Sequence, residues 1–237
     1  MNIPIPARER IIFALDVPTP EEAIALVDRL AGELVFFKVG LELFIAAGPQ
    51  IIHEIAHRGG RVMLDLKLHD VPATVRRSLL AMKPLPNIAF ATVHAEPQVM
   101  VAAAEAQAAG GPPVLGVTVL TSLGPDDLGA SGITKSPQEL VEMRARMARE
   151  AGLTGVVCSP WEASLLRGIA GPDFAIVTPG VRPAGPPVTG DDQKRVLTPA
   201  EAVAAGADHI VIGRPIRDAA DPVEAVRGIV ASLQSRS

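Results

Sequence analysis

Short apolar segments rich in β-branched residues alternate with longer amphipathic segments along almost the whole chain. The first pair shows the pattern: "RIIFALDV" at 10–17 predicts a strand, and "TPEEAIALVDRLAG" at 19–32 predicts a helix. Thr19 is expected to cap this helix, with Pro20 at its first position and a glycine at its end. Each such pair is one strand–helix unit.

The same unit recurs along the chain, more weakly in its last three copies. Strands are expected at 10–17, 34–40, 61–68, 88–95, 113–122, 154–159, 174–180 and 209–215. Helices are expected at 19–32, 50–60, 71–82, 98–111, 136–152, 160–171, 198–207 and 221–234. Eight such units predict an α/β fold, a single (β/α)8 TIM barrel that forms one domain over residues 1–237. A doubly wound open sheet is the alternative, disfavoured because the first strand–helix turn lacks the glycine-rich dinucleotide fingerprint.

The composition limits which partners and which cellular compartment are expected for this chain. With 237 residues, 48% of them apolar, the chain can bury a full core. A net charge of −4 with both signs mixed gives no basic stripe, so nucleic acid is not an expected partner. Cys158 has no second cysteine to pair with, which fits a reducing cytoplasm. No apolar run is long enough to span a bilayer and the N-terminus lacks a signal-like apolar region, so no membrane association is expected.

In a barrel of this kind, chemistry is located where the strands end. Polar residues at the ends of the apolar runs are therefore the candidates for a site. They are Asp16, Lys38, Asp65, Lys67, His94, Thr121, Ser122, Thr178, Gly213 and Arg214.

The stretch "MLDLKLHDVP" at 63–72 places charges inside a run that otherwise resembles a buried strand. Strand periodicity puts Met63, Asp65 and Lys67 on one face, toward the barrel interior, and the intervening leucines on the other. Asp70 falls in the loop that follows. One Asp-x-Lys pair is as consistent with a structural ion pair as with a site. Adding Lys38 on the neighbouring strand favours catalysis, because so many partly buried charges are costly to assemble for stability alone.

These residues carry a family resemblance. "LDLKLHDVPATV" resembles the signature of the orotidine 5′-monophosphate decarboxylase family, and "FALDV", "FFKVGLELF", "TVHA", "GVTVLTS", "TPGVRP", "GDDQKRV" and "IVIGRPI" follow in the family's order. The chain departs from the pattern at Leu68, where many members have an aromatic residue, and at Ala73, where many have asparagine. Neither departure removes a charge.

The resemblance implies decarboxylation of orotidine 5′-monophosphate to UMP in pyrimidine synthesis, with no cofactor and no metal. It implies a charged tetrad of Lys38, Asp65, Lys67 and Asp70, in which Lys67 protonates C6 of the pyrimidine. It also implies a homodimer with shared active sites, into which Asp70 and Thr74 reach from the neighbouring subunit. The remaining substrate contacts implied by the resemblance are Asp16 and Lys38 on the ribose, Thr121 and Ser122 on the pyrimidine edge, and Arg182, Gln193, Gly213 and Arg214 on the phosphate or on a lid at 178–196.

Two other functions remain open. A magnesium-dependent sugar-phosphate decarboxylase or aldolase of the same suprafamily would share the Asp-x-Lys-x-x-Asp array, but Lys38 stands where such enzymes tend to have a carboxylate. A noncatalytic barrel that binds nucleotides is the alternative from another class. His53 and His57 have metal-ligand spacing on a predicted helix, yet no third ligand is near, so we expect both to be solvated.

Overall fold

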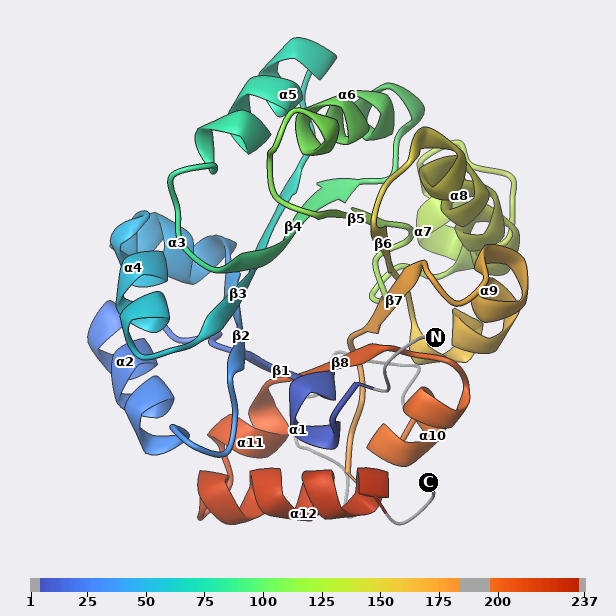
Figure 1. Ribbon diagram of the computed structural model, residues 1–237. Helices are drawn as coiled ribbons and strands as arrows, with labels where there is room; N and C mark the ends of the chain where they lie inside the picture. The colour runs from blue at the N-terminus through green and yellow to red at the C-terminus, as the bar shows by residue number, and fades with distance from the viewer. Residues whose placement is uncertain (1–4, 184–196, 235–237) are drawn as a thin grey trace.

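The structure, a computed structural model, describes residues 5–183 and 197–234. Eight parallel strands pair in sequence order and close into a barrel, with helices on its outside (Figure 1). The strands are β1 (Ile11–Ala14), β2 (Phe36–Gly40), β3 (Arg61–Leu68), β4 (Ile88–His94), β5 (Val114–Val117), β6 (Gly155–Val157), β7 (Ala175–Thr178) and β8 (His209–Ile212). The prediction of a (β/α)8 barrel is confirmed, and the open-sheet alternative is wrong because β1 pairs with β8.

The helices that follow the strands agree with the predicted positions, and short elements add to them. The long helices are α2 (Pro20–Arg29), α4 (Gln50–His57), α5 (Pro72–Ala81), α6 (Pro97–Ala108), α8 (Pro137–Ala151), α9 (Ala163–Ala170) and α12 (Pro222–Gln234). The shorter elements are α1 (Ala7–Arg10), α3 (Leu41–Ala47), α7 (Pro125–Ala130), η1 (Pro160–Glu162), α10 (Pro199–Ala204) and α11 (Arg214–Arg217). The sequence did not separate α1, α3, α7 or α11, because so few residues show no clear helical period.

Capping side chains determine where several helices begin. Thr19 accepts a hydrogen bond from the backbone N–H of Glu22, as predicted, and Pro20 is the first residue of α2. Ser136 and Thr198 start α8 and α10 in the same way, each in a capping box with a glutamate three residues on. The local sequence therefore determines where α2, α8 and α10 begin.

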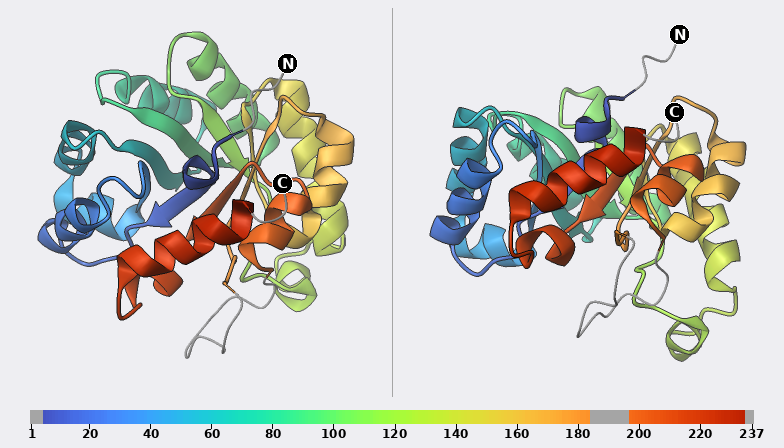
Figure 2. Two further views of the ribbon diagram at one scale, coloured as in Figure 1. Left: turned by 60° about the horizontal axis from the view of Figure 1, so that its bottom comes forward. Right: turned by 90° about the horizontal axis from the view of Figure 1, so that it is seen from below.

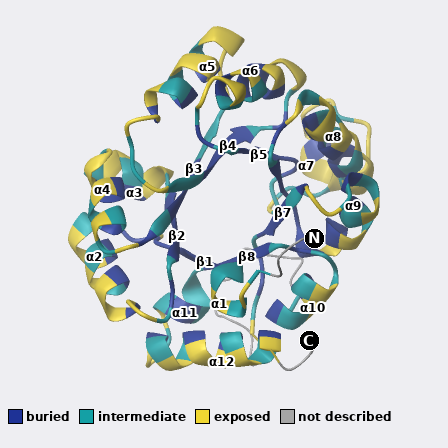
Figure 3. Cartoon of the chain, in the orientation of Figure 1, coloured by how far each residue is buried: buried dark blue, intermediate teal, exposed yellow. Residues whose placement is uncertain are grey.

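The barrel has two apolar layers. Inside it, side chains such as Ile12, Phe36, Met63, Phe90 and Leu115 form a compact interior cluster. Alternate strand residues point outward and pack beneath the helices in a larger cluster. The strands are accordingly buried along most of their length while the outer faces of the helices are exposed (Figure 3). The buried polar residues on the described strands include Lys38 on β2, Asp65 on β3 and His209 at the start of β8.

The two ends of the barrel carry different elements. Helix α1 lies at the end where the strands begin, whereas α7, which follows β5, lies at the opposite end (Figure 2). The predicted candidate residues lie on the strands or directly after them, toward the α7 side. Within the described residues, no helix is long and apolar enough to cross a membrane.

Candidate active site

Four charged side chains meet at the carboxyl ends of β1, β2 and β3, and we call Asp16, Lys38, Asp65 and Lys67 the charged network. Lys38 Nζ lies 2.8 Å from Asp16 Oδ1 and 3.8 Å from Asp65 Oδ2. Lys67 Nζ lies 2.8 Å from the same Asp65 oxygen. The structure thus brings Lys38, Asp65 and Lys67 together as predicted, with Asp16 as a further member.

Asp65 is the carboxylate at the centre of the network. Its burial would raise the pKa, but the charges of Lys38 and Lys67, with hydrogen bonds from Lys67 and Thr92, outweigh burial and hold the pKa of Asp65 below its usual value. Asp65 is only 7% exposed and Lys38 only 9%. The network therefore keeps one ionised carboxylate between two ammonium groups in a largely dry place.

The backbone of β3 is irregular where the charged residues lie. Leu64 pairs with Ala91 of β4 and Leu68 with Val93, so β3 advances four residues while β4 advances two. Lys67 has a φ of 49°, in the left-handed region, which costs a non-glycine residue about 1 kcal/mol. This irregularity departs from the simple two-residue period, yet it leaves the Lys67 ammonium beside Asp65. Backbone strain held at a functional site is a common arrangement.

Asp70 is not part of the network in the single chain. It is exposed in the loop after β3, where its carboxylate accepts the backbone N–H of Val71 at 2.6 Å. Among the described residues it forms no ion pair. Thr74 lies near it, half-buried in the first turn of α5. The fourth predicted member of the tetrad is thus set apart from the other three within one chain.

Two cavities open beside the charged network. The smaller, about 170 Å³, has Lys38, Asp65, Lys67 and Thr121 in its wall together with apolar residues. The larger, about 430 Å³, is lined by the polar and glycine residues Asp16, Lys38, Gly180, Arg182, Gly213, Arg214 and Arg217. Both include Lys38, Pro179 and Val211, so they adjoin. A largely apolar pocket beside an ammonium suits a flat ring, whereas a pocket with several cations suits an anion.

Some of the remaining predicted contact residues line the two cavities, and others do not. Thr121 lines the smaller cavity, while Ser122 next to it is exposed and lines neither. Arg182, Gly213 and Arg214 all line the larger cavity. Gln193 and most of the predicted lid lie outside the described residues.

The sequence did not single out Thr92 or Arg217. Thr92, on β4, donates its hydroxyl hydrogen to Asp65 Oδ1 at 2.9 Å, and Arg217 Nη1 donates to the backbone oxygen of Asp16 at 2.7 Å. Thr92 had one visible signal, a polar side chain within an otherwise apolar strand run. Arg217 had none, because its four-residue helix shows no period.

Two histidines lie beside the network. The rings of His69 and His94 are 5.4 Å apart. Burial, followed by the charges of His69 and Lys67, lowers the pKa of His94 below its usual value. A neutral His94 is compatible with the nearby Lys67 ammonium, whereas a charged imidazolium would be repelled by it.

No group of three or more His, Cys, Asp or Glu side chains in residues 5–183 and 197–234 has the geometry of a metal site. His53 and His57 are both exposed on α4. The prediction that both side chains are solvated is confirmed. Metal independence of the reaction remains a prediction.

A closed parallel barrel with an ammonium–carboxylate network and an arginine-lined cavity at the carboxyl ends of its strands has the arrangement of a barrel enzyme. Residues 9–229 match the model of the orotidine 5′-phosphate decarboxylase / HUMPS family. The chain belongs to this family, and it is an enzyme of the carboxy-lyase class.

Individual relatives cover nearly the full chain. The orotidine 5′-phosphate decarboxylase of Rhodopseudomonas palustris strain BisB5 is 48% identical over 226 residues, 95% of each chain. That of Xanthomonas campestris pv. campestris strain B100 is 46% identical over 235 residues, 98% of this chain and 95% of the relative. The crystal structure of the enzyme from Lactobacillus acidophilus matches with a TM-score of 0.83 at 36% identity, covering 95% of this chain and 99% of that one. The predicted family resemblance is confirmed.

Proposed function

We propose that this chain decarboxylates orotidine 5′-monophosphate to UMP, the last step of de novo pyrimidine synthesis, without a cofactor. The observation that carries the proposal is the Lys67 ammonium, held 2.8 Å from the ionised Asp65 in the wall of a largely apolar cavity. Relatives that are 46–48% identical over nearly the whole chain bear the name of this activity.

Lys67 is the proposed general acid. When the bond between C6 and the carboxylate breaks, carbon dioxide leaves and the electron pair stays on C6. The adjacent ammonium stabilises that charge and then gives C6 a proton, after which solvent reprotonates the amine. At about 4 Å and an effective dielectric near 20, one such charge pair is worth roughly 4 kcal/mol. The ionised Asp65 adds a second contribution, because it repels the substrate carboxylate before the bond breaks.

The larger cavity is the proposed site for ribose and phosphate. Asp16 and Lys38 bind the ribose hydroxyls at the boundary of the two cavities. Arg182, Gly213, Arg214 and Gln193 hold the phosphate dianion, and Thr121 and Ser122 read the pyrimidine edge. The guanidinium of Arg214, at the N-terminus of α11 after β8, supports this assignment, because phosphate commonly binds after strands 7 and 8 of such barrels. Binding of the unreactive phosphate then contributes to lowering the barrier at C6.

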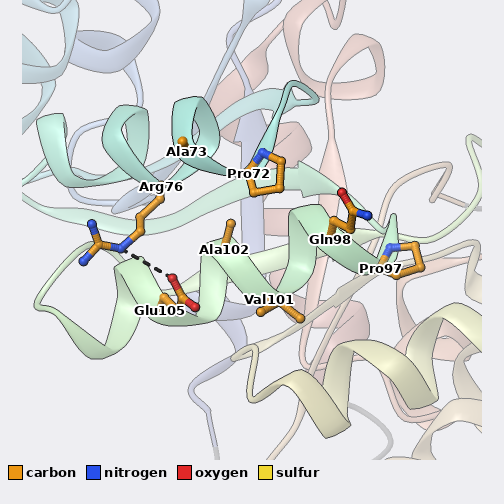
Figure 4. A pocket seen from close by; sticks show the side chains of 8 residues that line it. All are labelled: Pro72, Ala73, Arg76, Pro97, Gln98, Val101, Ala102 and Glu105. Atoms are coloured by element: carbon orange, nitrogen blue, oxygen red, sulfur yellow. Dashed lines mark ion pairs between the residues drawn. The ribbon is translucent and has the colours of Figure 1, made fainter.

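A homodimer with shared sites completes the proposal, with Asp70 and Thr74 reaching into the neighbour's site. Exposed apolar side chains on the segments that follow β2, β3 and β4 support it: Val71, next to Asp70 in the sequence, is 63% exposed, and Leu41 and Val101 are each 53% exposed. A groove of about 550 Å³ lies between α5 and α6 beside Val71, lined by Pro72, Ala73, Arg76, Pro97, Gln98, Val101, Ala102 and Glu105 (Figure 4). A second copy of the chain would cover this apolar surface and bring an unpaired carboxylate to the network.

Two inactive parents test the sharing of sites. In a heterodimer of a Lys67→Ala chain with an Asp70→Ala chain, sharing puts both lesions in one site and leaves the other intact. Random mixing of the subunits should then recover about a quarter of the wild-type activity, because a two-fold interface places equivalent residues reciprocally. No recovery after verified subunit exchange would show that Asp70 serves its own chain.

The activity itself is tested by the loss of ultraviolet absorbance when purified protein is mixed with orotidine 5′-monophosphate. Turnover to UMP supports the proposal. Tight UMP binding without turnover would favour a noncatalytic nucleotide-binding barrel. Turnover only of a sugar phosphate with magnesium would favour the other branch of the family, which the Lys38–Asp16 ion pair disfavours because an ammonium occupies the place of a metal-binding carboxylate.

A further inference from the structure

Thr92 links the backbone and the side chain of Lys67. Its hydroxyl oxygen accepts the backbone N–H of Lys67 at 2.9 Å, and its hydroxyl hydrogen goes to Asp65 Oδ1, also at 2.9 Å. The other oxygen of Asp65 accepts the Lys67 ammonium at 2.8 Å. A closed ring of hydrogen bonds therefore runs from the Lys67 backbone through Thr92 and Asp65 to the ammonium of the same lysine.

This ring lies where the regular strand pairing fails. Between the pairs Leu64–Ala91 and Leu68–Val93, Thr92 is the one β4 residue opposite three residues of β3. The Lys67 N–H is bonded to a side-chain oxygen of β4, and Lys67 is in the left-handed region with a φ of 49°. Without an acceptor at this place, the strained backbone of Lys67 would lose a hydrogen bond that supports it.

Thr92 has the chemistry that the position requires. It is 1% exposed, so neither bond is shared with solvent. A hydroxyl can donate one hydrogen bond and accept another at the same time. The branched Cβ restricts the side chain to few rotamers, which fixes the direction of both bonds. With one oxygen of Asp65 bonded to Thr92 and the other to Lys67, the plane of the carboxylate is set.

We infer that Thr92 is a positioning residue that orients Asp65 and fixes the backbone of Lys67, so that the Lys67 ammonium is held where the proton is transferred. This inference rests on the proposed role of Lys67 as the general acid. Thr92 need not touch the substrate, and it does not line either cavity beside the network. Its effect should therefore fall on turnover and not on nucleotide binding.

Thr92→Val tests the inference, because valine keeps the branched shape and removes the hydroxyl. We expect kcat to fall by about 10²-fold, the loss that a misplacement near 1 Å can cause. The dissociation constant for UMP should change by less than about threefold, since uniform binding is untouched. Thr92→Ser, which keeps the hydroxyl, should retain kcat to within about fivefold of wild type.

A matched control is Thr118→Val. Thr118 is also 1% exposed and its hydroxyl also makes a buried bond, to the backbone oxygen of Val157 at 2.9 Å, but it has no contact with the network. Its loss should lower the melting temperature while kcat stays within about twofold. Equal kcat in Thr92→Val and Thr118→Val, both folded, would overturn the inference.

The pH profile gives a second readout. Thr92 is one of the groups that lower the pKa of Asp65, so in Thr92→Val the acidic limb of the kcat profile should move to higher pH. An unmoved limb together with unchanged kcat would contradict the positioning role. If Thr92→Val does not fold, Thr92→Cys replaces it: a thiol bonds more weakly than a hydroxyl, so kcat should fall below that of Thr92→Ser. Equal kcat in the Ser and Cys variants would then overturn the inference.

Lys67→Ala separates this inference from the proposed function. If Lys67→Ala is inactive and Thr92→Val is fully active, only the role of Thr92 fails. If Lys67→Ala keeps wild-type turnover, the general-acid role fails, and the inference that depends on it fails as well.

Discussion

The two ends of the barrel interior bury polar groups in opposite electrostatic states. Where the strands finish, Asp65 stays ionised because Lys38 and Lys67 offset the cost of its burial. Where they begin, burial first of all lowers the pKa of His209 to about 4, although a hydrogen bond with the backbone of Glu9 acts in the opposite direction. His209 is therefore neutral at physiological pH.

Packing accounts for the difference. The ring of His209 meets Phe36 and Phe90 edge-on, with centroid distances of 5.5 and 5.7 Å, and Arg61 stacks over Phe36 from outside. This end is filled by aromatic rings, and a neutral imidazole completes their packing. At the other end, ion pairs border cavities large enough for a ligand. Among the described residues of the barrel strands, the buried ion pair of Lys38 and Asp65 thus lies at the end with the cavities, whereas Arg61 at the other end is partly exposed.

A large loss of turnover, second to that of Lys67→Ala, is expected for Asp65→Asn. Removing this charge leaves the Lys67 ammonium without its carboxylate partner and Lys38 with Asp16 alone, so kcat should fall by about 10³-fold or more. The control is Asp208→Asn, which removes the charge of a half-buried carboxylate that accepts from Arg167 at 2.5 Å, one residue before β8. Steady-state assays should show full turnover for the folded control. A comparable loss of turnover in both variants would remove the distinction between the two ends.

The next effect concerns the larger cavity. Arg214→Ala should lower kcat/KM for orotidine 5′-monophosphate by about 10²-fold, because a cation that contacts phosphate assists only a substrate that has one. Orotidine, which lacks the phosphate, should react equally slowly with the variant and the wild type. Equal proportional losses on the two substrates would take Arg214 out of phosphate binding. Arg146→Ala on the exposed face of α8 serves as the control.

A smaller effect, on stability alone, is expected at the opposite end. The folded-state pKa of His209 is depressed, so the unfolded chain binds the extra proton between pH 6.5 and about 4. The resulting stability is fully present above pH 6.5 and is lost as the pH falls through that window. The loss is at most about 3 kcal/mol.

His209→Leu should lack this contribution. Denaturant titrations should show that the stability of the variant relative to wild type rises as the pH falls from 6.5 to 4, while turnover at pH 7 is little changed. A difference in unfolding free energy that is constant with pH would show that His209 is not held neutral by its surroundings.

No effect at all is expected from chelation. Turnover of orotidine 5′-monophosphate should be the same before and after exhaustive treatment with a chelator. The Lys38 ammonium pairs with Asp16 and so takes the position in which a further metal-binding carboxylate would be needed. Recovery of lost activity by added magnesium would contradict this.

The sequence predicted the charged residues at the carboxyl ends of the strands better than the aromatic packing at the other end of the barrel. The bounds of β3, 61–68, were predicted correctly, and so was the common face of Met63, Asp65 and Lys67, because hydrophobic alternation is strong there. The extra residues of β3 opposite Thr92 could not be predicted, since the alternation of one strand says nothing of its partner's register. β5 ends at Val117, not at 122, because an apolar run continues into the loop.

Long-range contacts set the other limits. The role of His209 depends on Phe36 and Phe90, which are far from it in sequence and meet it only when the barrel closes. The same holds for the bond of Arg217 to Asp16, 201 residues away. The proposed role of Asp70 in a neighbouring subunit's site rests on the family resemblance, because the alternation within one strand says nothing about a second chain.

In the proposed mechanism, the Lys67 ammonium acts in the transition state. The most direct test of this role is to measure kcat and UMP affinity together for Lys67→Ala. We expect kcat to fall by about 10⁴-fold or more, while the dissociation constant for UMP should change by less than about tenfold. Equal losses in turnover and in UMP binding, or a variant that still turns over at the wild-type rate, would contradict this role.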